Sequence, residues 1–359
     1  MKLIRTIKDM KYSKLCNHFV WLLLTFALTG CFAIDEDLSD CGEEYKLTYQ
    51  LRIITNLTTE LETVLNEEDD APVAAALRNH LRDIFTDYAH DVDLSFYTTQ
   101  KDSTRLHHET HIMNANQSSY TIYLPVREYM HLAVANIADE AHVNLQQDNT
   151  CHQASLIQQR MDTIPPHTTG IFSARLPMQV KEGQDQDFLV QLYMVNCATA
   201  LVLDSALCQY NDVKIYTTGF ATDFQICDSL YIYPKESKDS PIVRADNIPI
   251  SGVNKLCYCS VNYPSPEASA TRTIIETTEP FLAQPSEETL WQYRCYVTLD
   301  NGSTTETIIS LKLPLRAGQL KILKGFIKND GEIVLTSDVE AGVSVTLDWK
   351  QGNTYEPKI

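Results

Sequence analysis

Residues 291–313 read WQYRCYVTLDNGSTTETIISLKL, and this stretch decides the class of fold. The segments 291–299 and 304–313 are rich in the β-branched and aromatic residues that favour strands. Between them lies Asp300-Asn301-Gly302, where Asn-Gly supplies the positive φ that a tight hairpin needs. The stretch therefore predicts two antiparallel strands joined by a short turn.

The same pattern recurs over most of the chain. A second hairpin signal, Asn329-Asp330-Gly331, separates strands predicted at 319–328 and 332–336. Residues 138–169 are polar and contain Pro165-Pro166, so they read as one long connection. The other predicted strands are 47–54, 92–96, 106–113, 119–124, 129–137, 187–194, 199–203, 212–217, 223–227, 229–233, 255–262, 272–277 and 342–349.

One segment has a helical period instead. Apolar residues recur every three or four positions from Val73 to Tyr88, directly after Asp70-Ala71-Pro72. This order predicts an amphipathic helix with Asp70 at its N-cap and an early proline. Short strands with turns every ten or so residues are typical of sandwiches. The sequence thus predicts a mainly β fold of two tandem antiparallel β-sandwich domains, 41–185 and 186–359, with a helix in the first.

The first forty residues predict export and a lipid anchor. Five basic residues precede an apolar run from Phe19 to Leu28, which is too short to span a bilayer. Leu28-Thr29-Gly30-Cys31 resembles a bacterial lipobox, so residues 1–30 are predicted to be a lipoprotein signal peptide and Cys31 the lipidated residue. An ordinary signal peptide with a chance cysteine is the alternative. Residues 31–40 form an acidic tether with a reach of at most about 30 Å.

The charge balance excludes one class of partner. The chain has 29 basic and 47 acidic residues. The segment 1–30 carries five of the basic residues and one of the acidic ones, so the mature chain has a net charge of −22. Such a charge repels nucleic acid, and no nucleic-acid partner is expected.

The cysteines permit disulfides without selecting a pairing. In an exported chain we expect one or two bridges, the remaining thiols being buried in strands. Cys257-Tyr-Cys259 places two thiols on one strand face, but no CxxC pair accompanies it, so a zinc site is not predicted. Eight cysteines remain once the signal and Cys31 are set aside: Cys41, Cys151, Cys197, Cys208, Cys227, Cys257, Cys259 and Cys295.

No catalytic constellation emerges. In His107-His108-Glu109-Thr110-His111 the spacing is wrong for a helical His-Glu-x-x-His zinc motif. On a strand, His107, Glu109 and His111 share one face and could chelate a divalent ion, but the polar, solvent-facing side of an edge strand is the preferred interpretation. The chain has no Gly-x-Ser-x-Gly elbow and no glycine-rich phosphate loop. We expect that the protein is not an enzyme and that it binds neither a cofactor nor a metal.

Taken in order, these pieces resemble a known family. The chain is similar to the FimB-like minor fimbrial lipoproteins, the anchors of type V fimbriae in anaerobic Gram-negative bacteria. The resemblance implies two transthyretin-like sandwiches, a lipid anchor in the outer membrane with surface exposure, and a fimbrial structural subunit as partner, bound by β-strand complementation. It is carried by the lipobox with Asp35–Cys41, then 120–125, 129–136, 192–198, 313–318 and 345–349.

Two other roles stay open. A glycan-binding surface lipoprotein of a polysaccharide-uptake system would also be acidic, lipidated and all-β. Exposed aromatic rings usually stack on sugars, and after residue 30 the only tryptophans are Trp291 and Trp349, although the chain has 18 tyrosines. A role at the tip of the fibre instead of its base is the third alternative.

Overall fold

The computed structural model describes most of the chain after residue 43. The predicted signal peptide, Cys31 and the tether lie outside the described residues, and contacts from Tyr45 onward cluster into one compact unit. The division at residue 185 stays a prediction. The described ranges are 44–54, 65, 68–85, 89–100, 103–113, 119–147, 150–183, 185–234, 240–267, 272–273, 280–281, 290–336 and 341–348.

A seven-stranded sheet is built from the first half of the chain. Its order is β3-β2-β5-β8-β9-β1-β4, with every printed pair antiparallel except β1 and β9, which run parallel. The predicted strands at 47–54, 92–96, 106–113, 119–124 and 129–137 are confirmed in this sheet. Its strands are β1 (Glu44–Ile54), β2 (Asp91–Thr98), β3 (Arg105–Ile112), β4 (Ser119–Pro125), β5 (Glu128–Ala135), β8 (Phe172–Gln179) and β9 (Gln186–Met194).

Two five-stranded sheets follow and enclose the second core. The first has the order β15-β16-β10-β21-β22 and the second β14-β11-β19-β20-β23. Trp291, Tyr293 and Leu323 are buried in the core that these strands share. The strands are β10 (Cys197–Asp204), β11 (Tyr210–Thr218), β14 (Val243–Arg244), β15 (Asp246–Ile248), β16 (Lys255–Asn262), β19 (Trp291–Leu299), β20 (Thr304–Leu311), β21 (Leu320–Ile327), β22 (Ile333–Leu335) and β23 (Ala341–Asp348).

Both predicted hairpins are confirmed. Residues 300–303 join β19 to β20, with Gly302 at φ +81° and its N–H donating to the carbonyl of Leu299 at 2.9 Å. Gly331, at φ +83°, closes the turn between β21 and β22. The mainly β sandwich fold is therefore confirmed, although β10 and β21 pair in parallel.

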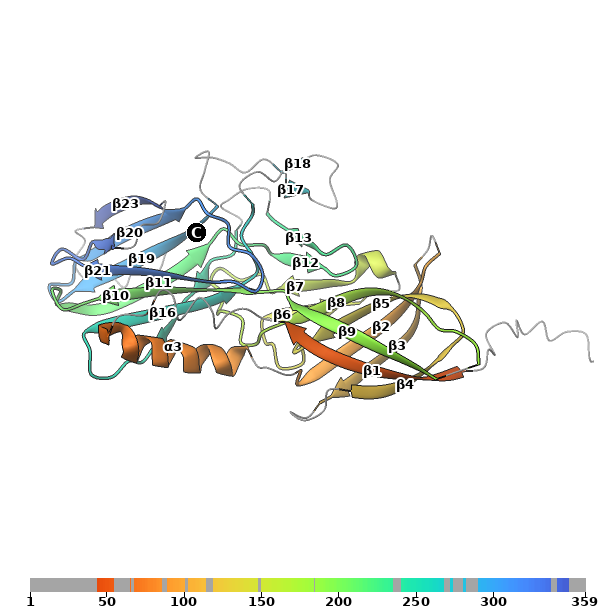
Figure 1. Ribbon diagram of the computed structural model, residues 1–359. Helices are drawn as coiled ribbons and strands as arrows, with labels where there is room; N and C mark the ends of the chain where they lie inside the picture. The colour runs from red at the N-terminus through yellow and green to blue at the C-terminus, as the bar shows by residue number, and fades with distance from the viewer. Residues whose placement is uncertain are drawn as a thin grey trace, which may run out of the picture. The chain divides into compact units, whose positions relative to one another are not determined.

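The predicted helix is α3 (Ala71–Ile84), preceded by the 3-10 turn η2 (Glu68–Asp70). Its buried face, including Val73, Leu77 and Leu81, belongs to a core that also holds Cys257 and Cys259 of β16. In Figure 1 the helix lies along β16. The apolar period found in the sequence thus marks the face that covers one of the five-stranded sheets.

Asp70 differs from the prediction. It occupies the N-cap position, but its side chain makes no capping hydrogen bond. Its two carboxylate oxygens instead accept from Lys255 Nζ of β16 and Lys324 Nζ of β21, each at 2.6 Å. Burial alone would raise the pKa of Asp70, but the two lysines outweigh burial and the pKa is lowered.

The prediction of one long connection at 138–169 is wrong. The segment contains β6 (Val143–Gln146), the 3-10 turn η3 (Cys151–Gln153) and β7 (Ser155–Gln158). With β12 (Asp223–Gln225) and β13 (Leu230–Ile232) they form a four-stranded sheet whose apolar face, including Leu156 and Phe224, packs on β5. Strands of three or four residues are too short to show a period of two, so the sequence carries no strand signal there. A two-stranded sheet of β17 (Arg272–Thr273) and β18 (Pro280–Phe281) completes the described elements.

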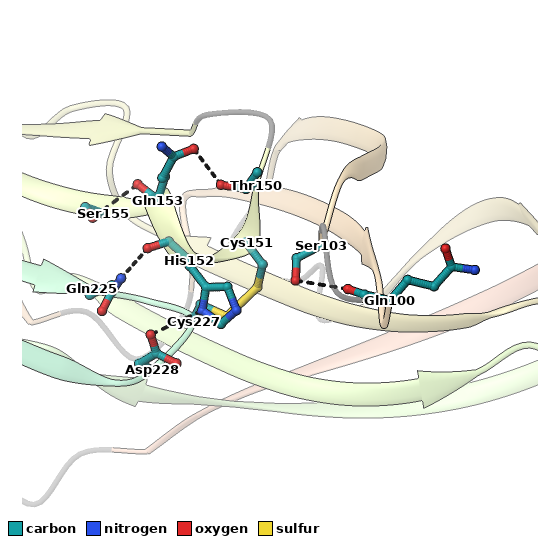
Figure 2. The surroundings of a disulfide bond; sticks show 10 residues. All are labelled: Gln100, Ser103, Thr150, Cys151, His152, Gln153, Ser155, Gln225, Cys227 and Asp228. Carbon is teal, nitrogen blue, oxygen red and sulfur yellow. Dashed lines mark hydrogen bonds and ion pairs between the residues drawn. A yellow bond between two sulfur atoms is a disulfide. The ribbon is translucent and has the colours of Figure 1, made fainter. Parts of the chain in front are cut away.

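One disulfide, Cys151–Cys227, is formed among the described residues (Figure 2). It joins η3 to the turn that follows β12, next to the pairing of β7 with β12. Cys197, Cys208, Cys257, Cys259 and Cys295 are free and buried, as expected for thiols within strands.

Candidate docking edge

The strands at the ends of each sheet are the places where a further strand could pair. In the seven-stranded sheet these strands are β3 and β4. The five-stranded sheets end in β14, β15 and β22, which have only two or three residues, and in β23, whose side chains are not described. β3, with eight residues, is the longest end strand with described side chains, and within the described ranges it pairs only with β2.

The inner face of β3 carries a row of ionisable side chains. His107, Glu109 and His111 stand opposite Phe96, Leu94 and Val92 of β2, so they continue the core face of the sheet to its edge. The Glu109 carboxylate binds His107 Nε2 at 2.5 Å and His111 Nε2 at 2.8 Å. The predicted shared face is confirmed, but the solvent-facing assignment is wrong, because these side chains are only about a third exposed.

Ring contacts hold this row in place. The His107 ring lies 5.8 Å from the Phe96 ring, and the His111 ring stacks at 5.0 Å on Tyr120 of β4. β3 and β4 are the two ends of the sheet order, so this stacking shows that the sheet curls until its ends approach each other. On β4 the inward residues Tyr120 and Ile122 are buried in the same core.

The outer face of β3 is apolar at both ends. Leu106 and Ile112 are exposed, Ile112 to 89%. Between them, His108 Nε2 binds Asp93 Oδ2 of β2 at 2.8 Å. Charged groups on the inner face of an edge strand oppose unselective pairing, whereas exposed apolar groups favour burial against a partner. The edge therefore suits a strand of matched sequence.

The start of β3 is fixed from outside the sheet. Thr104 forms an isolated antiparallel bridge with Thr150, and the Cys151 N–H donates to the Ser103 carbonyl at 3.0 Å. Figure 2 shows Ser103 beside Cys151 of the disulfide. The pairing of Cys151 with Cys227, which the sequence left open, thus anchors the segment that leads into the edge strand.

The other predicted features are structural. Cys257 and Cys259 are buried in the core under α3, and burial raises the pKa of Cys257 to about 12, which keeps its thiol protonated. Trp291 is buried and its Nε1–H donates to the Leu313 carbonyl at 3.0 Å, while Trp349 lies outside the described residues. None of the helices in the described ranges is both long and apolar enough to cross a membrane.

Comparison with known proteins gives a family match. Residues 67–233 match the family of fimbrillin-A associated anchor proteins Mfa1 and Mfa2, which confirms the resemblance found in the sequence. No protein of curated function matches the chain significantly. The family indicates a fimbrial, adhesion-related role and a place at the cell surface or in the envelope.

Three solved structures of fimbrial proteins are similar to the chain at low identity. The fimbrial anchor protein Mfa2 from Porphyromonas gingivalis is 10% identical with a TM-score of 0.44, over 85% of this chain and 98% of that one. The tip fimbrial protein Mfa3 from Porphyromonas gingivalis is 11% identical with a TM-score of 0.38, over 85% and 100%. A fimbrial assembly protein from Parabacteroides distasonis is 14% identical with a TM-score of 0.36, over 85% and 98%.

Proposed function

With residues 67–233 belonging to the fimbrillin-A associated anchor protein family, we propose that this chain holds or caps a fimbrial fibre at the outer membrane. The family match is the observation that carries the proposal. The protein acts as a structural and adhesive component, without catalysis. It sits at the base of the fibre and limits its length.

The membrane attachment is through Cys31. The lipobox Leu28–Cys31 supplies the acceptor sulfur, and two or more acyl chains hold a protein stably at a bilayer. The segment from Cys31 to the start of β1 at Glu44 then keeps the seven-stranded sheet near the lipid surface. The docking edge therefore belongs to the same sheet as β1, the first strand after the anchor segment.

The partner subunit binds by adding a strand to β3. Backbone groups along eight residues supply the hydrogen bonds, and side-chain contacts at alternate positions supply specificity. On one face the added strand covers Leu106 and Ile112, and on the other it meets the row His107, Glu109 and His111. A matching strand thus carries polar groups toward the row and apolar groups toward the outer face.

The anchor is tested by Cys31→Ala in the full-length chain. The variant is expected to fold and to leave the membrane fraction, because the only covalent attachment to lipid is lost. Cys208→Ala is the control, since that thiol is buried and free and its loss leaves the attachment intact. Retention of the Cys31→Ala protein in washed outer membranes would refute the lipid attachment.

The docking edge is tested by Ile112→Lys, alone and with Leu106→Lys. A lysine on an edge strand opposes pairing, so co-purification of the fimbrial shaft subunit is expected to fall while the thermal midpoint is unchanged. Leu207→Lys, at a side chain 67% exposed on the loop between β10 and β11, is the matched control. Undiminished binding of the shaft subunit by the double variant would refute the proposal that β3 is the docking edge.

A glycan-binding role has one observation in its favour. A cleft of about 600 Å³ lies beside β11, β14 and β15 and is lined by the side chains of Asp212, Lys214, Arg244, Asp246 and Asn247. Such groups can form hydrogen bonds with sugar hydroxyls. Retention on a glycan array that is lost in Arg244→Ala would support this role, and retention of the fimbrial subunit would support the anchor.

A further inference from the structure

The disulfide lies between two further side chains that can bind a metal. Each cysteine is followed by a potential ligand, giving Cys151-His152 on η3 and Cys227-Asp228 after β12. The Ile226 N–H donates to the Ala154 carbonyl at 3.0 Å, so the backbone holds the two segments together. Figure 2 shows His152 and Asp228 side by side next to the sulfur pair.

The potential ligand atoms lie close together. Ligand atoms of His152, Cys227 and Asp228 all lie within 4.8 Å of one another, and His152 Nδ1 is 3.4 Å from Asp228 Oδ2. The α-carbons of Cys151 and Cys227 are 5.7 Å apart. Both sulfurs are buried, whereas His152 and Asp228 are exposed, so an ion could enter from solvent and reach a largely dry pair of sulfurs.

We propose that, when the disulfide is reduced, Cys151, His152, Cys227 and Asp228 form a site for one zinc ion. Two thiolates, one imidazole and one carboxylate are ligands that zinc accepts in tetrahedral geometry. With Zn–S bonds of about 2.3 Å, two thiolates on one zinc lie roughly 3.8 Å apart. Side chains whose α-carbons are 5.7 Å apart span that separation by small rotations.

The chemistry balances in two steps. A dithiol reductant is oxidised to its own disulfide, and its two hydrogens pass to the sulfurs of Cys151 and Cys227. Zinc then displaces the two thiol protons to solvent and binds both thiolates, the imidazole of His152 and the carboxylate of Asp228. Either the covalent bond or the metal therefore closes the same link.

The connection between Cys151 and Cys227 matters because Cys151 contacts the segment that leads into β3. The Cys151 N–H donates to the Ser103 carbonyl, and Thr150 bridges Thr104, directly before β3. Under reducing conditions, zinc takes over the role of the disulfide in holding the start of this edge strand. The reduced, metal-free protein is the form in which that segment is least restrained.

Zinc binding to the purified full mature chain tests the proposal. One sample is kept oxidised and another is reduced with a phosphine, which transfers two hydrogens from water to the sulfurs and keeps the oxygen. Both samples are titrated with zinc against a colorimetric chelator. We expect one tightly bound zinc per reduced chain and none per oxidised chain. Circular dichroism of the reduced sample checks that the fold persists, and loss of the fold would overturn the proposal.

Ligand variants locate the ion. His152→Ala and Asp228→Asn are each expected to weaken zinc binding more than about tenfold, the loss that even outer partners of a metal site cause. His108→Ala, which removes an imidazole of β3 that is 37% exposed and paired with the Asp93 carboxylate of β2, is the matched control and is expected to bind zinc like the parent. Equal affinity of all three variants, or no zinc in the reduced parent, would refute the site.

Discussion

Asp70→Asn removes the negative charge that joins the start of α3 to the five-stranded sheet containing β16 and β21. The Asp70 side chain is fully buried, whereas the side chains of Lys255 and Lys324 are 18% and 23% exposed. The substitution keeps the shape of the side chain but leaves two ammonium groups facing a neutral amide. The expected result is a loss of stability, since each lysine loses its ion pair with Asp70 at the base of the helix.

The size of the loss follows from the exposure of the lysines. Breaking a fully buried ion pair costs about 3–5 kcal/mol because the remaining charge is left without a partner. Here both ammonium groups can turn partly toward water, so we expect about 2–4 kcal/mol. For a chain of this length, at an unfolding entropy of about 2 cal/mol/K per residue, that corresponds to a fall of about 3–6 °C in the thermal midpoint.

The assay is urea unfolding of parent and variant at several pH values. The pKa of Asp70 is lowered in the folded state, so its contribution is complete above its unfolded pKa and is lost as the pH falls through the folded pKa. The difference between parent and variant is therefore expected to be constant from pH 7 to pH 5 and to shrink below about pH 4. Glu332→Gln, which breaks the exposed pair with Lys328 at the same 2.6 Å distance, is the control and is expected to change little. Equal stability of the Asp70→Asn variant and the parent at pH 7 would refute the argument.

Three further outcomes are expected. Gly219→Ala places a Cβ 2.7 Å from the backbone of Trp291 and is expected to cost about 1–3 kcal/mol more than Gly183→Ala, which also has positive φ but no atom within 4 Å, by urea unfolding. Burial lowers the pKa of His131 to about 4. The parent is therefore expected to lose on the order of 3 kcal/mol of stability from this group as the pH falls from 6.5 toward 4. His131→Leu is expected to flatten that pH dependence, and an unchanged slope would contradict the assignment. The Cys257 thiol is expected to resist alkylation at pH 8 until denaturant is added, and rapid labelling of the folded protein, read by mass spectrometry, would show that the core under α3 opens.

The elements that the sequence predicted well are those whose signal is local. β16 and β19 begin and end where the strand pattern does, because β16 is buried on both faces from Cys257 to Asn262, whereas buried and half-buried residues alternate over the first half of β19. The turn at Gly302 follows from the backbone conformation that Asn-Gly favours. α3 was recognisable because its apolar stripe has the helical period over four turns.

The failures have a common physical cause, which is that partners distant in sequence decided the outcome. Asp70 had the composition of a helix cap, yet two lysines 185 and 254 positions later compete for its carboxylate, and charge-assisted bonds are stronger than a cap. β6 and β7 are too short to carry a periodic signal and exist because their apolar residues cover β5. No local pattern predicts such contacts.

At the docking edge, too, partners distant in sequence determine where the side chains point. The sequence placed His107, Glu109 and His111 on one strand face, but their direction depends on which strand lies beside β3 and on where Tyr120 comes to rest. Once that pairing is known, the row lies at the margin of the core, and under the proposed docking an added strand would meet its charged groups on one face and cover Leu106 and Ile112 on the other. Because a charge that is covered without a partner is costly, the proposed docking would gain its selectivity by rejecting strands that are apolar on both faces.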